Sequence, residues 1–228
     1  MIKTWFVTGT DTEVGKTHSS CALLAALAQQ TGQRVAGYKP VASGSEWREE
    51  MWQNDDALAL LKASNVSLTY DQVNVLSLAE ATAPHIASEA EGRPIVLADL
   101  NQGLQQIQQQ ADYVVVEGAG GWHVPLLPGV DFADWVVSQR LPVILVVGVK
   151  LGCINHALLS AHAVLDAGLA LEGWIANEVV PAGPRQAEYL ASLQALLPAP
   201  CLGVIGHGVA PAAAGQALNL APIMGLIN

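Results

Sequence analysis

The chain has 228 residues, of which 51% are hydrophobic and 13% charged, and its formal net charge is −10. This composition excludes a disordered chain, and because no linker-like segment interrupts it, we expect residues 1–228 to form a single domain. An acidic chain without a basic patch repels a phosphate backbone, which argues against a nucleic-acid partner.

Short apolar runs alternate with segments of helical periodicity along the chain. The runs predict strands at residues 5–8, 35–38, 113–116, 142–147, 171–176 and 201–205. Apolar residues at three- and four-residue spacing predict helices at residues 16–30, 55–63, 97–110, 132–138, 154–167 and 185–197. This alternation predicts an α/β fold, a doubly wound and mostly parallel sheet with helices on both faces. The alanine-rich segment 208–217 is the weakest to assign, and we expect a poorly packed helix or a loop there.

The segment between the first predicted strand and the first predicted helix resembles a P-loop. It reads Gly9-Thr-Asp-Thr-Glu-Val-Gly15-Lys16-Thr17, although the usual spacing would place the first glycine at position 10. Backbone N–H groups of such a loop cradle phosphate, the lysine adds positive charge, and the Thr17 hydroxyl can ligate magnesium. The alternative is an ordinary strand-to-helix turn that contains glycine. The placement favours the P-loop and a P-loop NTPase-like fold.

Three other charged residues are candidates for the site, and two of them, Lys39 and Glu117, follow predicted strands, where ligands of parallel sheets bind. Lys39 ends the second strand; a lysine there is costly without an anion, although a solvated strand-end lysine is the alternative. Asp56 lies in the run Asn54-Asp55-Asp56 before a helix, either as part of an N-cap or as a magnesium ligand. Glu117 precedes Gly118-Ala119-Gly120-Gly121 and is either a second magnesium-side carboxylate or a structural cap.

The segment from Lys150 to His156 follows the fourth predicted strand and opens a helix. Its backbone N–H groups could bind a carboxylate. Cys153 and His156 lack the further ligands that a zinc site needs, and the spacing of the histidines supports no catalytic triad. The sequence therefore gives no indication of nucleophilic catalysis.

Cysteine usage and hydropathy bear on the cellular location. Cys21, Cys153 and Cys201 form no disulfide framework and fit a reducing compartment. Residues 1–3 lead into a strand rather than a signal peptide, and the apolar run 143–147 is too short to cross a bilayer. We expect a cytoplasmic protein with no membrane partner.

Four motifs together resemble the dethiobiotin synthetase family. They are residues 9–17, Gly-Tyr-Lys-Pro-Val-Ala-Ser-Gly at 37–44, Val-Glu-Gly-Ala-Gly-Gly-Trp at 116–122, and Leu-Pro-Val-Ile-Leu-Val-Val-Gly-Val-Lys-Leu-Gly-Cys-Ile-Asn-His-Ala at 141–157. The resemblance extends to about Gly203. It implies a homodimer that uses ATP, Mg²⁺ and CO₂ to convert 7,8-diaminononanoate to dethiobiotin. In the family, one amine captures CO₂ as a carbamate, its oxygen attacks the γ-phosphate to give a carbamic-phosphoric anhydride, and the second amine closes the ring.

The same resemblance implies roles for individual residues. Lys16 and Lys39 would be catalytic, against carbamate and phosphate oxygens. The nucleotide would be bound by Glu13, Val14, Gly15, Lys16, Thr17, His18, Asp56, Glu117, Gly118, Ala119, Gly120 and Asn177. Among these, Asn177 would face the base. Thr17, Asp56 and Glu117 would hold Mg²⁺. The substrate would be bound by Thr12 and Ser43 and, from the partner subunit at its tail carboxylate, by Gly152, Cys153, Ile154, Asn155 and Tyr189.

One segment departs from the family pattern. Where relatives carry a Pro-aromatic-Leu segment and a later glutamate near the base, this chain reads Gly206-His207-Gly208 and then an alanine-rich run, which leaves the base preference open. Three other functions are alternatives. A cobyrinate-type amidotransferase would need a glutaminase domain. A switch ATPase of the partition or iron-protein type carries a second lysine where this chain has Asp11. A paralogue would act on a related diamine.

Overall fold

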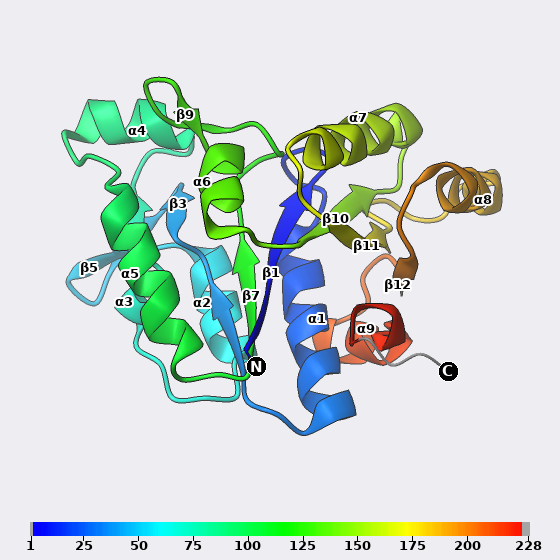
Figure 1. Ribbon diagram of the computed structural model, residues 1–228, viewed down its shortest axis with the longest axis horizontal. Coiled ribbons are helices and arrows are strands. Elements are labelled where there is room, and N and C mark those ends of the chain that lie inside the picture. The colour runs from blue at the N-terminus through cyan, green and yellow to red at the C-terminus, as the bar shows by residue number, and fades with distance from the viewer. Residues whose placement is uncertain (1, 225–228) are drawn as a thin grey trace.

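A six-stranded parallel sheet runs through the centre of the computed structural model, which describes residues 2–224 (Figure 1). The sheet has the order β12-β11-β10-β1-β7-β2. Its strands are β1 (Lys3–Gly9), β2 (Val35–Tyr38), β7 (Tyr113–Glu117), β10 (Val143–Gly148), β11 (Leu171–Asn177) and β12 (Cys201–Ile205). These are the strands that the apolar runs predict, each within two residues of its predicted ends. The predicted parallel sheet is confirmed.

Helices cover both faces of this sheet because successive strand residues point to opposite sides and all must be buried. Trp5 and Val7 of β1 pack against the side that carries α1 (Lys16–Thr31) and α2 (Asp55–Ala63). Phe6 packs on the other side. That side carries α5 (Leu97–Gln108), α6 (Phe132–Gln139), α7 (Cys153–Asp166) and α8 (Gln186–Leu196). The doubly wound arrangement and the six predicted helices are confirmed. Among residues 2–224, no helix combines the length and apolar character needed to cross a membrane.

Several short elements near the sheet escape prediction because they have too few residues to show a period. Two of them, β3 (Val41–Ser43) and β6 (Leu76–Leu78), pair in parallel beyond the end of β2. The others are α3 (Tyr70–Val73), α4 (Pro84–Glu91) and the hairpins β4 (Glu46–Arg48) to β5 (Met51–Gln53) and β8 (Pro125–Leu127) to β9 (Val130–Asp131). The segment after β6 matters for function, because residues 81–83, with Ser43 of β3 and Pro84 of α4, form one wall of a cavity described below.

The alanine-rich tail forms short helical pieces and approaches α1 closely at Gly215. It forms α9 (Pro211–Ala214), a 3₁₀ turn (Gly215–Ala217) and α10 (Ala221–Met224). A Cβ atom at Gly215 would lie 2.8 Å from the carbonyl oxygen of Ala22, so the small residues let the tail approach the backbone of α1. Within residues 208–217, however, only Ala214 and Gly215 are buried and most of the others are exposed, so the prediction of a poorly packed helix or a loop holds for most of this segment. The single domain of residues 1–228 stays a prediction, and Met1 and residues 225–228 lie outside the described residues.

Candidate active site

The loop between β1 and α1 folds around its own lysine. Gly15 has a φ of 81° and precedes the first residue of α1, a left-handed conformation that glycine adopts without steric cost. The Lys16 side chain turns back along the loop, and its Nζ donates to the backbone oxygen of Asp11 at 3.0 Å. Lys16 is buried although it carries a charge. The loop therefore has the form that the P-loop motif predicts, with its cation at the rim of a cavity.

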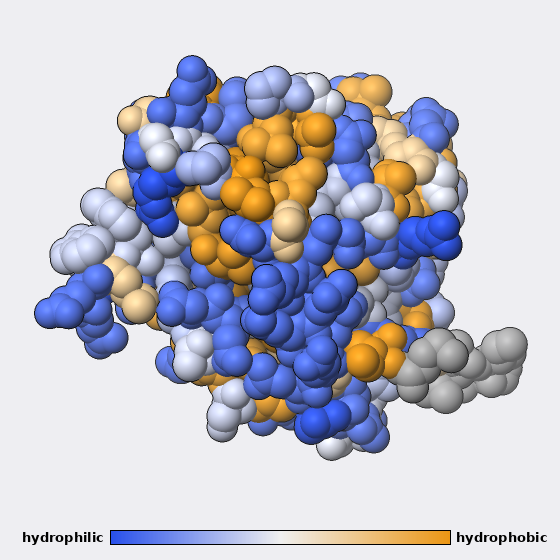
Figure 2. Space-filling model, turned by 60° about the vertical axis from the view of Figure 1, so that its left-hand side comes forward, coloured by the Kyte–Doolittle hydropathy of each residue, from blue (hydrophilic) through white to orange (hydrophobic). Residues whose placement is uncertain are grey.

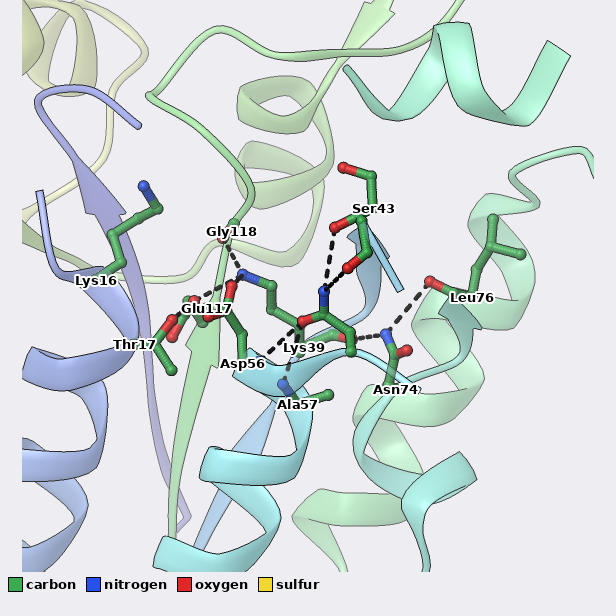
Figure 3. Close-up of polar contacts among 12 residues, drawn as sticks. Lys16, Thr17, Lys39, Ser43, Asp56, Ala57, Asn74, Leu76, Glu117 and Gly118 are labelled. Atoms are coloured by element: carbon green, nitrogen blue, oxygen red, sulfur yellow. Dashed lines mark hydrogen bonds and ion pairs between the residues drawn. The ribbon is translucent and has the colours of Figure 1, made fainter. Parts of the chain in front are cut away.

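Four predicted residues from separate segments meet beside this loop (Figure 3). Lys39 Nζ lies 2.6 Å from Glu117 Oε1 and 3.1 Å from Asp56 Oδ2, and it donates to the backbone oxygen of Gly118 at 3.1 Å. The Thr17 hydroxyl donates to the same Glu117 oxygen at 2.7 Å. Because Lys39 and Glu117 end neighbouring parallel strands, the sheet brings them together at one edge.

Burial and charge act against each other in this cluster. Glu117 has no exposed surface and Lys39 is 4% exposed. Burial alone would lower the pKa of Lys39, but the carboxylates of Glu117 and Asp56 outweigh it and hold that pKa above its ordinary value. Burial, with repulsion from Lys39, lowers the pKa of Lys16 to about 8. Burial would raise the pKa of Asp56, yet Lys39 and hydrogen bonds hold it below its ordinary value. Lys39 thus stays a cation.

A cavity of about 460 Å³ opens in front of the cluster. It is lined by Thr12, Glu13, Gly15, Lys16, Thr17, His18, Lys39, Ala42, Ser43, Asp56, Ala119 and Gly120. A second cavity of about 530 Å³ shares five of these residues and extends to the loop before α4, with walls at residues 81–84, Gly121 and Val124. The first cavity offers cations, hydroxyls and backbone N–H groups, which suit phosphate; the second is largely neutral and suits a carbon chain.

The sequence analysis did not predict the part of the second cavity's wall that residues 81–84 form. The segment 81–84 follows the three-residue strand β6, whose pairing with β3 gave no period to detect. The Ser43 hydroxyl donates to the backbone oxygen of Thr82 at 2.7 Å. This hydrogen bond joins a residue that lines both cavities to a residue that lines the second. Asn74 was missed too; its buried amide donates to the backbone oxygen of Lys39 and fixes the end of β2 (Figure 3).

Several predicted residues stand behind the cavity rather than on its surface. The Asn54 side chain accepts hydrogen bonds from the backbone N–H groups of Asp56 and Ala57, so the predicted N-cap of α2 is present and holds Asp56 toward the cavity. Asn177 is 7% exposed, and its Nδ2 donates to the backbone oxygen of Val14 at 2.9 Å. This amide, predicted to face the base, therefore contacts the P-loop itself.

The predicted tail-carboxylate residues lie apart from both cavities of their own chain. Gly152 caps the N-terminus of α7 with a φ of 93°. Cys153 follows with a buried side chain, so its backbone rather than its thiol is available there. Tyr189 lies on α8, whose side chains pack toward the core beside α7. Neither Tyr189 nor residues 152–155 line the phosphate cavity or its neighbour.

The donor set beside the loop fits a magnesium ion. Thr17, Asp56 and Glu117 offer a hydroxyl and two carboxylates, and magnesium takes oxygen ligands of this kind together with phosphate oxygens and water. Glu117 Oε2 is buried without a hydrogen-bond partner among the described residues. A buried carboxylate oxygen that lacks a partner is costly, and a cation at this position would satisfy it.

The sequence is similar to a known group of enzymes over nearly its whole length. A family model described as an AAA domain matches residues 3–207. The chain is 56% identical over 224 residues to ATP-dependent dethiobiotin synthetase BioD 1 of Escherichia coli (strain K12), covering 97% of this chain and 99% of the relative. It is 60% identical over 207 residues to BioD 1 of Yersinia pestis, covering 91% and 86%. The similarity extends past Gly203, where the sequence motifs alone placed its end.

Solved structures with the same fold are more distant in sequence. A ParA family ATPase from Chlorobium tepidum TLS superposes with a TM-score of 0.55 at 15% identity, covering 97% of this chain and 93% of that one. MinD from Aquifex aeolicus gives 0.53 at 15% identity, covering 96% and 88%. Identity this low shows a common P-loop NTPase-like fold and nothing of the activity. The identity to the enzymes of E. coli and Y. pestis, in contrast, shows that this chain belongs to the family of ATP-dependent dethiobiotin synthetases.

Proposed function

We propose that this protein forms dethiobiotin from 7,8-diaminononanoate, CO₂ and ATP. The observation that carries this function is the cluster of Lys39, Glu117, Asp56 and Thr17 beside Lys16, at the wall of one cavity. Phosphoryl transfer needs reactants held in line and charge neutralised, and the charges of this cluster would serve the second need without a protein nucleophile.

The triphosphate is proposed to bind along the P-loop. Backbone N–H groups of residues 13–18 would cradle its oxygens, and Lys16 would neutralise the outer phosphates. Residues 118–120 would close the opposite side of the same cavity, since Ala119 and Gly120 already line it. A magnesium ion held by Thr17, Asp56 and Glu117 would add charge neutralisation at the phosphate oxygens.

The reacting end of the diamine is proposed to lie between the two cavities, near Thr12 and Ser43, which line both. Lys39 would then face the carbamate formed there and the transferring phosphoryl group, where negative charge develops, on the way to a carbamic-phosphoric anhydride. The carbon chain would run into the neutral second cavity, along Ala83, Pro84 and Val124.

A homodimer is proposed to complete the substrate site. Residues 152–155 and Tyr189 lie outside the cavities of their own chain, so a partner subunit can supply them to the tail carboxylate. Apolar surface supports such a contact. A groove of about 600 Å³ between α4 and the β8–β9 hairpin has largely apolar walls, including Ile95 and Leu127, on the side shown in Figure 2. Its neighbours Pro84 and Val124 belong to the substrate cavity.

The test is product formation by the purified protein. With ATP, magnesium and bicarbonate, adding 7,8-diaminononanoate should give dethiobiotin by mass and start phosphate release. Lys39→Met should lower this turnover about a thousandfold, whereas Lys62→Met, a change at an exposed residue of α2, should not. Rapid ATP hydrolysis without diamine, stimulated by a protein or membrane partner, would instead indicate a switch ATPase. A cytoplasmic location is part of the same proposal.

A further inference from the structure

Asn177 connects three loops at the carboxyl edge of the sheet. It is the last residue of β11, and its Nδ2 donates to the backbone oxygen of Val14 in the P-loop. Its own backbone oxygen accepts from the N–H of Val149, after β10. The next residue, Glu178, donates its N–H to the backbone oxygen of Ile205 at the end of β12. Asn177 is therefore held in place by the sheet while its side chain reaches the loop.

The contact from Asn177 sets the orientation of one peptide group. In a trans peptide the C=O of one residue and the N–H of the next point in opposite directions, and the described backbone has no cis peptide bond. When Asn177 holds the carbonyl of Val14 on the protein side, the N–H of Gly15 must point the other way. Gly15 lines the phosphate cavity, so this N–H is directed to where a phosphate would bind.

The residue type at position 15 fits this contact closely. A Cβ atom at Gly15 would lie 2.0 Å from Asn177 Nδ2, far inside the closest approach of two such atoms. The positive φ of Gly15 already favours glycine, and any larger residue there would force the Asn177 amide away from the loop. The loop conformation and the side chain of Asn177 thus depend on each other.

We propose that Asn177 is a positioning residue for triphosphate binding, acting through the Val14–Gly15 peptide. Its effect falls on the phosphates, whatever base the nucleotide carries, and so differs from the base contact expected for this residue. The inference rests on the proposed binding of a triphosphate at this loop. Without the amide, the Val14 carbonyl loses its buried partner and the peptide can rotate, which lowers the share of molecules with the N–H of Gly15 in place.

A ligand without a base separates the two roles. The dissociation constants of magnesium–ATP and of inorganic tripolyphosphate with magnesium are measured by calorimetry for the wild type and for Asn177→Ala, with Asn177→Ser as a second variant in case the first folds poorly. We expect both ligands to bind about fivefold more weakly or worse to the variant. Gln30→Ala is the matched control, because it removes another amide-to-backbone hydrogen bond, to Leu218, far from the loop. The control should leave both affinities unchanged.

The comparison of ATP with tripolyphosphate binding distinguishes the positioning role of Asn177 from a contact with the base. Equal losses for ATP and tripolyphosphate support the positioning role, and a larger loss for ATP adds a base contact to it. A loss for ATP alone, with tripolyphosphate binding unchanged, would overturn the proposal. So would a wild-type protein that binds ATP but not tripolyphosphate, since the base would then provide the affinity. A wild type that binds neither ligand would refute the proposed function itself.

Discussion

Replacing Lys39 by methionine should destabilise the empty protein as well as inactivate it. The substitution keeps the length of the side chain and removes its charge. Glu117 has no exposed surface and one of its oxygens already lacks a partner, so only the Thr17 hydroxyl would remain to it. Leaving one member of a buried ion pair alone costs about 3–5 kcal/mol. The Asp56 side chain is 45% exposed and would regain water, so its share of the cost is small.

Urea unfolding without nucleotide, followed by tryptophan fluorescence, measures this cost as a change in the free energy of unfolding. Lys39→Met should lower it by about 3 kcal/mol or more, and Lys62→Met by no more than about 0.5 kcal/mol. The double variant Lys39→Met/Glu117→Gln should recover part of the loss, since no buried charge is left, giving a coupling of about 1–3 kcal/mol. If Lys39→Met were as mild as Lys62→Met, the buried pair would not exist in the folded protein.

Three further predictions follow from the site. The affinity of the protein for ATP should fall as the pH rises through about 8, because the Lys16 ammonium, whose pKa is lowered, then loses its proton. Calorimetry from about pH 7 to about pH 9 measures this affinity, and an affinity that does not change with pH would contradict the prediction. Affinities for ATP, CTP and GTP should lie within about tenfold of one another, given the Gly206-His207-Gly208 segment; strong ATP preference in competition assays would refute this. Subunit exchange between Lys16→Ala and Asn155→Ala dimers should restore roughly a quarter of wild-type turnover if two chains share each site, and none otherwise.

The fold was predictable where one physical signal dominated. The strands of the sheet are buried on both faces, so each appears in the sequence as a short apolar run such as that of β10. Lys39 and Glu117 were found because parallel strands end at the same edge, so each residue that follows a strand is a candidate, whereas Asp56 was found in an acidic run before a helix. These parts of the site could therefore be predicted from the order of strands and helices along the chain.

What could not be predicted depends on contacts between distant residues. The two hydrogen bonds to Glu117 Oε1, from Thr17 and Lys39, join three segments, and no local pattern encodes such a pairing. The same holds for the amide of Asn177, whose partner Val14 lies 163 positions away. The close approach of Gly215 to α1 was not predicted, because alanine and glycine give little hydrophobic signal, although their small size is what permits such an approach.

The ion cluster gives the site an internal counter-ion. Lys39 pairs with Glu117 Oε1 and Asp56 Oδ2, so a bare metal ion that takes these two oxygens must displace a charged amine from buried surroundings. A metal ion that arrives with a triphosphate meets less opposition, because the phosphate oxygens offer the displaced ammonium a new anionic partner in the same cavity. The proposed site would therefore discriminate between a free ion and its nucleotide complex, and it would do so by competition rather than by shape.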